Sequence, residues 1–222
     1  KAFFTSSSGG FFLTQDGGVT FTQPTFTPVG AISDVFFTDN TNGFMAGITG
    51  LYNTVDGGLT WQKVAAMGLN INGYTSLSFI NTNTGWVVSQ SGIYKTNGSL
   101  TNWQASIISG GTASASFGSV YAVTASIVYA ANNLGEIFKS TDGGANFNFT
   151  KKLDEQGFTD VHFITDQLGY ANSSRTIYKT TDGGASWSKV VSMGAGFITE
   201  IHFTDASHGW AGNSYGAVLI LK

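Results

Sequence analysis

The stretch "TTDGGASW", Thr180 to Trp187, decides the fold of this 222-residue chain because it recurs. Related stretches are "TQDGGVTF" (14–21), "TVDGGLTW" (54–61) and "STDGGANF" (140–147), and a fifth, "TNGSLTNW" (96–103), lacks the acid. Each has Ser or Thr seven residues before an aromatic residue, and these aromatic residues fall at 21, 61, 103, 147 and 187. An active site needs its residues once, so residues that recur at this spacing indicate a structural repeat.

One repeat, residues 33–64, contains four short runs rich in strand-forming residues and separated by turn residues. The runs, named A to D, are 34–38, 44–48, 51–54 and 60–64, and the unit recurs as 75–108, 117–150 and 159–191. Residues 3–23 supply runs B, C and D only, and residues 199–221 supply A, B and C only. Four strands in about 40 residues are typical of a propeller blade.

The sequence therefore predicts an all-β fold, a β-propeller of four-stranded antiparallel blades without helices. Four complete blades flanked by two three-stranded ones favour a six-bladed ring, with five or seven blades as alternatives. We expect one domain over residues 1–222. Because the chain starts within the pattern at "KAFFTSSSGG", we expect a mature product or a fragment of a longer chain.

The Asp-Gly-Gly sequence has two explanations. Asp can accept hydrogen bonds from nearby backbone N–H groups, and the glycines permit the positive φ angles of a tight hairpin. Calcium is the alternative, but it needs six or more oxygen ligands, and each stretch offers one carboxylate. We favour the turn, which gives structural roles to Asp16, Asp56, Asn97, Asp142 and Asp182.

Composition excludes several classes of function. The chain has no cysteine, which removes disulfides, thiolate catalysis and cysteine-bound zinc. Its net charge of −3 does not favour nucleic acid or anionic lipid. No run approaches the ~20 apolar residues of a membrane span, so membrane insertion is not expected.

The motif Ser/Thr-x-Asp-Gly-Gly-x-x-Trp/Phe, with run A ending in "FFTDNTNGF", "FINTNTGW", "FITDQLGY" or "FTDASHGW", resembles the Asp-box (bacterial neuraminidase repeat) propellers. Together with "IYKTTDGGASW" it is most similar to the photosystem II assembly factor-like subgroup. The resemblance covers nearly the whole chain and implies fold more than function. A sialidase would need three arginines, and the assembly factors have an arginine-rich patch, whereas Arg175 is the only arginine here.

Acids and histidines outside the turns recur on run A. Asp34, Asp160 and Glu200 share one position, which lines the channel of a propeller, and a solvated lining is the simplest interpretation. A metal site is the weaker alternative, with candidate ligands Asp160, His162, Glu200 and His202. We predict no catalytic residues and no cofactor.

The loops differ between the two ends of the repeat. A–B and C–D turns are uniform, whereas B–C loops and D–A connectors vary and carry charges that the repeat does not require. Loops on a rigid scaffold usually hold recognition residues, so we expect a binding face there. Its candidates are Glu136, Lys151, Lys152, Asp154, Glu155, Arg175 and Tyr215.

These observations predict a non-enzymatic, exported propeller for binding or scaffolding. We expect a protein or surface-glycan partner, with self-assembly as an option, and an extracellular or cell-surface location. Two alternatives stay open: the propeller portion of a larger glycoside hydrolase, and a photosystem assembly factor-like protein.

Overall fold

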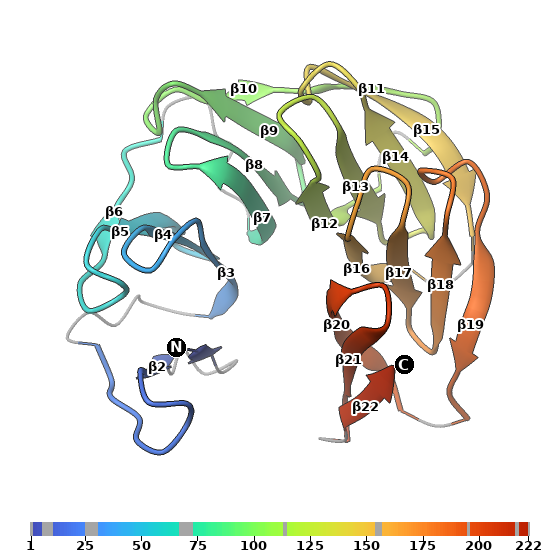
Figure 1. The fold of residues 1–222 in the computed structure, drawn as a ribbon. Helices are drawn as coiled ribbons and strands as arrows, with labels where there is room; N and C mark the ends of the chain where they lie inside the picture. The colour runs from blue at the N-terminus through green and yellow to red at the C-terminus, as the bar shows by residue number, and fades with distance from the viewer. Residues whose placement is uncertain are drawn as a thin grey trace. The chain divides into compact units, whose positions relative to one another are not determined.

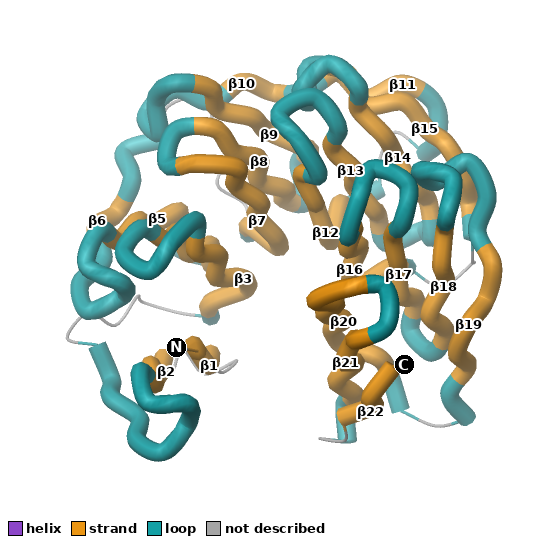
Figure 2. The backbone as a smooth tube through the Cα atoms, in the orientation of Figure 1, coloured by secondary structure: helices purple, strands orange, loops and turns teal. Residues whose placement is uncertain are grey.

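The computed structural model describes residues 2–5, 11–24, 31–66, 73–112, 115–153, 157–194, 196–215 and 218–221. In this part of the chain, strands alternate with loops and no helix occurs (Figure 2). There is accordingly no helix here with the length and hydropathy to cross a membrane. Contacts divide the chain into two compact units, Lys1–Ala105 and Ser106–Lys222. The expectation of a single domain stays a prediction.

The first unit contains three sheets (Figure 1). Sheet 1 pairs β1 with β2, and Thr22 adds a single antiparallel bridge to Leu13. Sheets 2 and 3 are antiparallel and follow chain order from β3 to β6 and from β7 to β10. The strands are β1 (Ala2–Thr5), β2 (Phe11–Thr14), β3 (Ile32–Phe37), β4 (Gly43–Gly47), β5 (Gly50–Thr54), β6 (Gln62–Lys63), β7 (Tyr74–Asn81), β8 (Thr84–Ser89), β9 (Gly92–Asn97) and β10 (Gln104–Ala105).

The second unit also contains three sheets. Sheet 4 holds β12 to β15 with β11 added beside β15, sheet 5 holds β16 to β19, and sheet 6 holds β20 to β22. The strands are β11 (Ile107–Ser109), β12 (Phe117–Ala122), β13 (Val128–Asn132), β14 (Glu136–Ser140), β15 (Asn146–Lys152), β16 (Phe158–Phe163), β17 (Gly169–Ser173), β18 (Thr176–Thr180), β19 (Ser188–Ser192), β20 (Ile198–Asp205), β21 (His208–Asn213) and β22 (Val218–Leu221).

The predicted fold class, an all-β propeller of four-stranded antiparallel blades, is confirmed. Runs A, B and C of residues 33–64 correspond to β3, β4 and β5 within two residues at each end. Run D is shorter than expected, since β6 covers only Gln62–Lys63.

One run was assigned wrongly. Residues up to 108 were expected to complete the antiparallel sheet of residues 75–108, but that sheet ends at β10. The chain then crosses over, and β11 pairs in parallel with β15. Ser106 Oγ donates to the carbonyl of Gly144 (2.6 Å), and Ile107 N–H donates to that of Ala145 (2.9 Å). Sheet 4 therefore has a fifth strand that the period of the repeat did not reveal.

A phenylalanine at or near the end of strand A anchors most repeats. Phe163 stacks on Tyr129 of the preceding sheet, with centroids 3.8 Å apart, and meets Trp187 of its own sheet edge-on at 6.0 Å. Phe79 is held in the same way by Phe44, at 3.6 Å, and Trp103, at 6.1 Å. These rings lie in the apolar layers between consecutive sheets, where a sheet buries the face that it cannot bury alone.

Each anchoring phenylalanine requires glycine at the start of strand B. A Cβ added to Gly169 would lie 2.5 Å from the ring of Phe163, and one added to Gly85 would lie 2.3 Å from the ring of Phe79. Sheet 4 has the opposite combination of residue sizes at this position. The pair in the register of Phe163 and Gly169 is there Ala122 and Val128, so a small residue on strand A accompanies a larger one on strand B.

This pairing predicts a coupled substitution. Gly169→Val should lower the free energy of unfolding by about 1–3 kcal/mol through overpacking, and Phe163→Ala by about 3–5 kcal/mol through a cavity. The double variant, which copies Ala122 and Val128, should lose at least ~1 kcal/mol less than the sum. Urea unfolding of the four proteins measures the coupling, and simple additivity would contradict the packing described.

Candidate functional site

In the Asp-Gly-Gly turns, the carboxylate accepts its hydrogen bonds from residues of the same turn. Thr180 Oγ1 donates to Asp182 Oδ1 (2.8 Å) and accepts from Gly184 N–H (2.9 Å). Ser186 donates its N–H to Oδ1 (2.8 Å) and its hydroxyl to Oδ2 (2.5 Å) of the same aspartate. Equivalent bonds surround Asp16, Asp56 and Asp142.

Sequence reasoning missed one member of these turns. The residue before the closing aromatic residue donates to the aspartate from both backbone and side chain, and it is Thr20, Thr60, Asn146 or Ser186. Its recurrence as a side-chain donor was visible in the sequence. The side chain of Ser186 is the main reason that the pKa of Asp182 falls to about 2, and that of Asn146 does the same for Asp142.

The fifth copy forms its turn without an acid. Asn97 is the last residue of β9, and Gly98 takes a positive φ of 89°. Thr96 Oγ1 donates to the carbonyls of Asn102 (2.8 Å) and Ser99. Hydroxyl-to-carbonyl bonds here replace the hydroxyl-to-carboxylate bond of the other turns.

Two of the strand A acids connect neighbouring sheets, Asp34 in the first unit and Asp160 in the second. Asp34 Oδ2 accepts from the N–H of Leu77 on the next strand A (2.9 Å). Asp160 Oδ1 accepts from the hydroxyl of Ser119 (3.0 Å), and that hydroxyl accepts from the N–H of Val161 (3.1 Å). These half-buried carboxylates therefore hold adjacent A strands together, a role beyond the solvated lining that we expected.

The two strand A histidines lie together. The rings of His162 and His202 meet edge-on with centroids 5.2 Å apart, and Tyr121 lies 4.8 Å from His162 on its other side. His162 Nε2 is bonded to the carbonyl of Phe203 (3.0 Å). Burial, followed by the charge of His202, lowers the pKa of His162 to about 4.

Of the metal candidates, the structure thus brings His162 and His202 together, while Asp160 bonds to Ser119. Glu200 is exposed on β20. Within the described ranges, no three His, Asp or Glu side chains gather so that they could hold a metal ion.

Glu136 is a buried anchor, which differs from its expected place on an exposed binding face. It is 6% exposed and accepts hydrogen bonds from Asn132 Nδ2 (2.6 Å) and from the N–H and hydroxyl of Thr112 (both 3.0 Å). Burial raises its pKa, but these bonds and the charge of Lys152 bring it below the ordinary value. Glu136 thereby fixes the segment that follows β11.

Three exposed side chains gather where sheets 5 and 6 meet, and we call them the Arg-Phe-Tyr cluster. The Arg175 guanidinium lies 5.5 Å from the ring centre of Phe197, which is 52% exposed. Tyr215 is 76% exposed, and its ring lies over Gly196, where an added Cβ would come within 3.0 Å of it. One cation and two aromatic rings are thus presented to solvent from three loops.

Backbone bonds hold these loops in place. Met193 N–H donates to the carbonyl of Arg175 (2.8 Å), and Ser214 N–H donates to that of Phe197 (2.8 Å). Phe197 N–H donates to Ser214 Oγ (3.0 Å). The cluster combines the predicted Arg175 and Tyr215 with Phe197, which the sequence analysis missed. A large aromatic residue after the glycines of "MGAGF" was the available signal.

The other predicted face residues come from sheet 4. Lys151 and Lys152 are exposed at the end of β15, opposite Ile137 and Glu136 in register. Asp154 and Glu155 lie outside the described residues. The structure therefore places Arg175 and Tyr215 in one cluster and the two lysines on a separate strand.

Comparison with known proteins supports the fold. No family model and no curated protein matches the sequence. Among solved structures, one of YCF48 bound to D1 peptide matches with a TM-score of 0.65 and 21% identity, over 85% of this chain and 64% of that one. An ancestral GH74 enzyme matches with a TM-score of 0.69 and 16% identity, over 97% and 35%.

A third match is the extracellular domain of a putative hybrid two component system from B. thetaiotaomicron. Its TM-score is 0.79 and its identity 12%, over 99% of this chain and 31% of that one. The chain thus spans less than two thirds of the length of each of these three structures. At these identities the matches show a shared β-propeller fold.

The turn geometry predicts how an acid contributes to stability. Asp142→Ala should lower the free energy of unfolding by about 1 kcal/mol, the size of a lost local capping interaction. Asp166→Ala, which removes an exposed acid from an A–B turn, should change it by less than ~0.5 kcal/mol. Equal effects in thermal or urea unfolding would contradict a special role for the Asp-Gly-Gly turn.

His162 predicts a pH dependence of stability. The unfolded imidazole, with an ordinary pKa of 6.5, binds a proton that the folded one, with a pKa of about 4, does not bind. Stability should therefore fall as the pH drops from 6.5 to 4, by about 1–2 kcal/mol after allowance for partial exposure. Urea unfolding at pH 7 and 4.5 should show a smaller loss in His162→Phe, which copies Phe36 at the same register position. An equal loss in both proteins would refute the assignment.

Proposed function

We propose that this protein is a non-enzymatic, exported binding or scaffolding propeller that recognises a protein partner through the Arg-Phe-Tyr cluster. The observation that carries the proposal is the joint exposure of Arg175, Phe197 and Tyr215 on loops held by backbone hydrogen bonds. Arginine and tyrosine are among the residues that contribute most to protein interfaces. The guanidinium suits a carboxylate, and the two rings suit an apolar or aromatic neighbour.

The use of the acids supports a binding role over hydrolysis. A glycoside hydrolase needs two carboxylates facing one substrate bond. Most acids in the described ranges bond within a turn, as Asp182 does, or between strands, as Asp160 does. The competing hypothesis, a portion of a larger hydrolase, keeps its support from the GH74 match, which covers 35% of that enzyme.

Two further matches favour protein recognition outside the cell. One solved neighbour holds a peptide, and another is an extracellular domain. The photosystem assembly hypothesis is less favoured, because Arg175 is the only arginine of the chain. The partner that we infer is a polypeptide with an acidic group next to apolar side chains.

Peptide selection tests the proposed function. Phage-displayed peptides selected on the wild-type protein should be enriched in acidic and aromatic residues, and calorimetry should show at least tenfold weaker binding to the triple variant R175A/F197A/Y215A. The control V55A/L59A removes exposed apolar side chains at the opposite, Asp-Gly-Gly end of a repeat and should bind like wild type.

The alternatives give different results in the same assays. Peptides that bind both variants equally, or that lose binding only to V55A/L59A, would place the recognition surface elsewhere. A glycan array is screened in parallel. If glycan binding depends on the cluster and peptide binding does not, the partner is a sugar and not a protein. Release of sugars from xyloglucan would support the hydrolase.

A further inference from the structure

The A strands of sheets 5 and 6 bring two imidazole rings into contact. His162 lies on β16 and His202 on β20, and their ring centroids are 5.2 Å apart. His162 is half-buried, whereas His202 is exposed, so one ring is held by packing and the other is reached from solvent. Imidazole is the commonest protein ligand of metal ions, and it suits Zn²⁺, Cu²⁺ and Ni²⁺.

The distance between the two rings suits a shared ion. A metal–imidazole bond of about 2.0–2.1 Å, with the ring centre ~1.2 Å beyond the nitrogen, puts each ring centroid roughly 3.2 Å from the ion. Two ligands at a tetrahedral angle then have centroids about 5.2 Å apart. This value matches the separation of His162 and His202. The planes of the rings are inclined by 65°, so they do not stack face to face.

A backbone carbonyl fixes the tautomer of His162. Nε2 of this residue is bonded to the carbonyl of Phe203 (3.0 Å). A carbonyl only accepts, so Nε2 carries the proton and Nδ1 keeps the lone pair that a metal ion requires. Histidines that bind metals almost always donate their other ring N–H to a carbonyl or carboxylate in this way. Burial, followed by the charge of His202, lowers the pKa of His162 to about 4, so its ring is neutral at pH 7.

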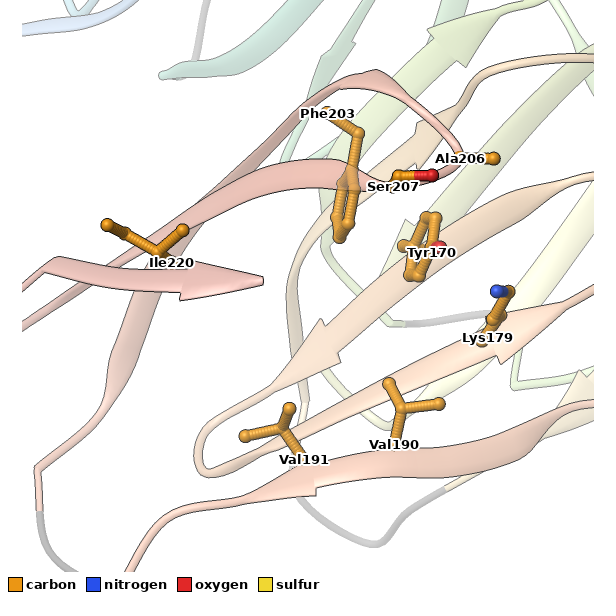
Figure 3. Close-up of a pocket in the computed structure, with 8 residues that line it drawn as sticks. All are labelled: Tyr170, Lys179, Val190, Val191, Phe203, Ala206, Ser207 and Ile220. Carbon is orange, nitrogen blue, oxygen red and sulfur yellow. The ribbon is translucent and has the colours of Figure 1, made fainter. Parts of the chain in front are cut away.

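Aromatic neighbours hold His162 in place. Phe203, whose carbonyl accepts the hydrogen bond, stacks on Tyr170 at 3.6 Å, and Figure 3 shows these two rings next to one another. Tyr170 is also the cross-strand partner of His162. Tyr121 packs on the other side of the imidazole at 4.8 Å. Burial, followed by the charge of Asp160, raises the pKa of Tyr121, so this phenol stays neutral and serves as a packing group.

The neighbouring acids do not complete a metal site. Asp160 Oδ1 accepts from the hydroxyl of Ser119 and from the N–H of Val161. In the part of the chain that the structure describes, no group of three His, Asp or Glu side chains is placed to hold an ion. Two imidazoles therefore leave the other coordination positions to water, as open metal sites do. Nitrogen ligands favour transition metals over Ca²⁺ and Mg²⁺, which take oxygen ligands.

We propose that His162 and His202 bind one divalent transition-metal ion, Cu²⁺, Ni²⁺ or Zn²⁺, with water in the remaining positions. Nδ1 of His162 is one ligand, and a ring nitrogen of the exposed His202 is the other. Cu²⁺ binds most tightly of the three, as the general order of affinities requires. The ion joins β16 to β20 and thereby sheet 5 to sheet 6. This site lies on strands and does not rest on the function proposed for the loops of the Arg-Phe-Tyr cluster.

Metal titration tests the site. Full-length protein without an affinity tag is titrated with Cu²⁺ in a calorimeter, and binding should saturate at one ion per chain. The electron paramagnetic resonance spectrum of the bound Cu²⁺ should show two imidazole nitrogens. Zn²⁺ should raise the Tm, because an ion that binds only the folded state stabilises it. The chain has no cysteine, so no thiolate competes for these ions.

Variants locate the bound ion. His202→Ala changes an exposed residue and should weaken Cu²⁺ binding at least tenfold and abolish the rise in Tm with Zn²⁺. His162→Phe should have the same effects, and urea unfolding checks that it is folded. His208→Ala is the matched control, because the remaining histidine of the chain is exposed and bonded to Asp205, and it should bind like wild type. R175A/F197A/Y215A should also bind like wild type, which separates this site from the proposed function.

Three results would overturn the proposal. The first is Cu²⁺ binding that persists when both His162 and His202 are replaced, since the ion would then be bound elsewhere. The second is a loss of binding in His208→Ala as large as that in His202→Ala. The third is the absence of saturable binding of Cu²⁺, Ni²⁺ and Zn²⁺ to the wild-type protein.

Discussion

The arrangement of the sheets depends on how a strand A phenylalanine ring packs against the first residue of strand B. Phe163 packs flat on Tyr129, meets Trp187 edge-on and leaves no room for a Cβ at Gly169. Such aromatic contacts add to the hydrophobic effect and have defined geometry, so they fix the distance and rotation between consecutive sheets. Strand A, strand B and the Asp-Gly-Gly turn therefore cannot vary independently, and their motifs recur together.

Most acids in the described part of the chain are engaged in hydrogen bonds within a turn or between strands. The carboxylates of the turns accept several hydrogen bonds each, which depresses the pKa of Asp182 to about 2 and keeps the acid charged and locally engaged. Two carboxylates of strand A join neighbouring sheets, Asp34 through Leu77 N–H and Asp160 through the Ser119 hydroxyl. The Arg-Phe-Tyr cluster, which we propose as the recognition surface, lies on loops that the repeat does not constrain.

Repeat spacing and turn chemistry predicted the blades, their strand order and the local use of Asp16, Asp56, Asp142 and Asp182, because these depend on contacts within a few residues. They could not predict that β11 leaves its sheet for β15, that Glu136 is buried beneath Thr112, or that Phe197 joins Arg175 and Tyr215. Those outcomes depend on which segments, distant along the chain, come to share a surface. A periodic pattern describes each blade in isolation, whereas packing between blades decides which side chains become buried anchors and which remain available to a partner.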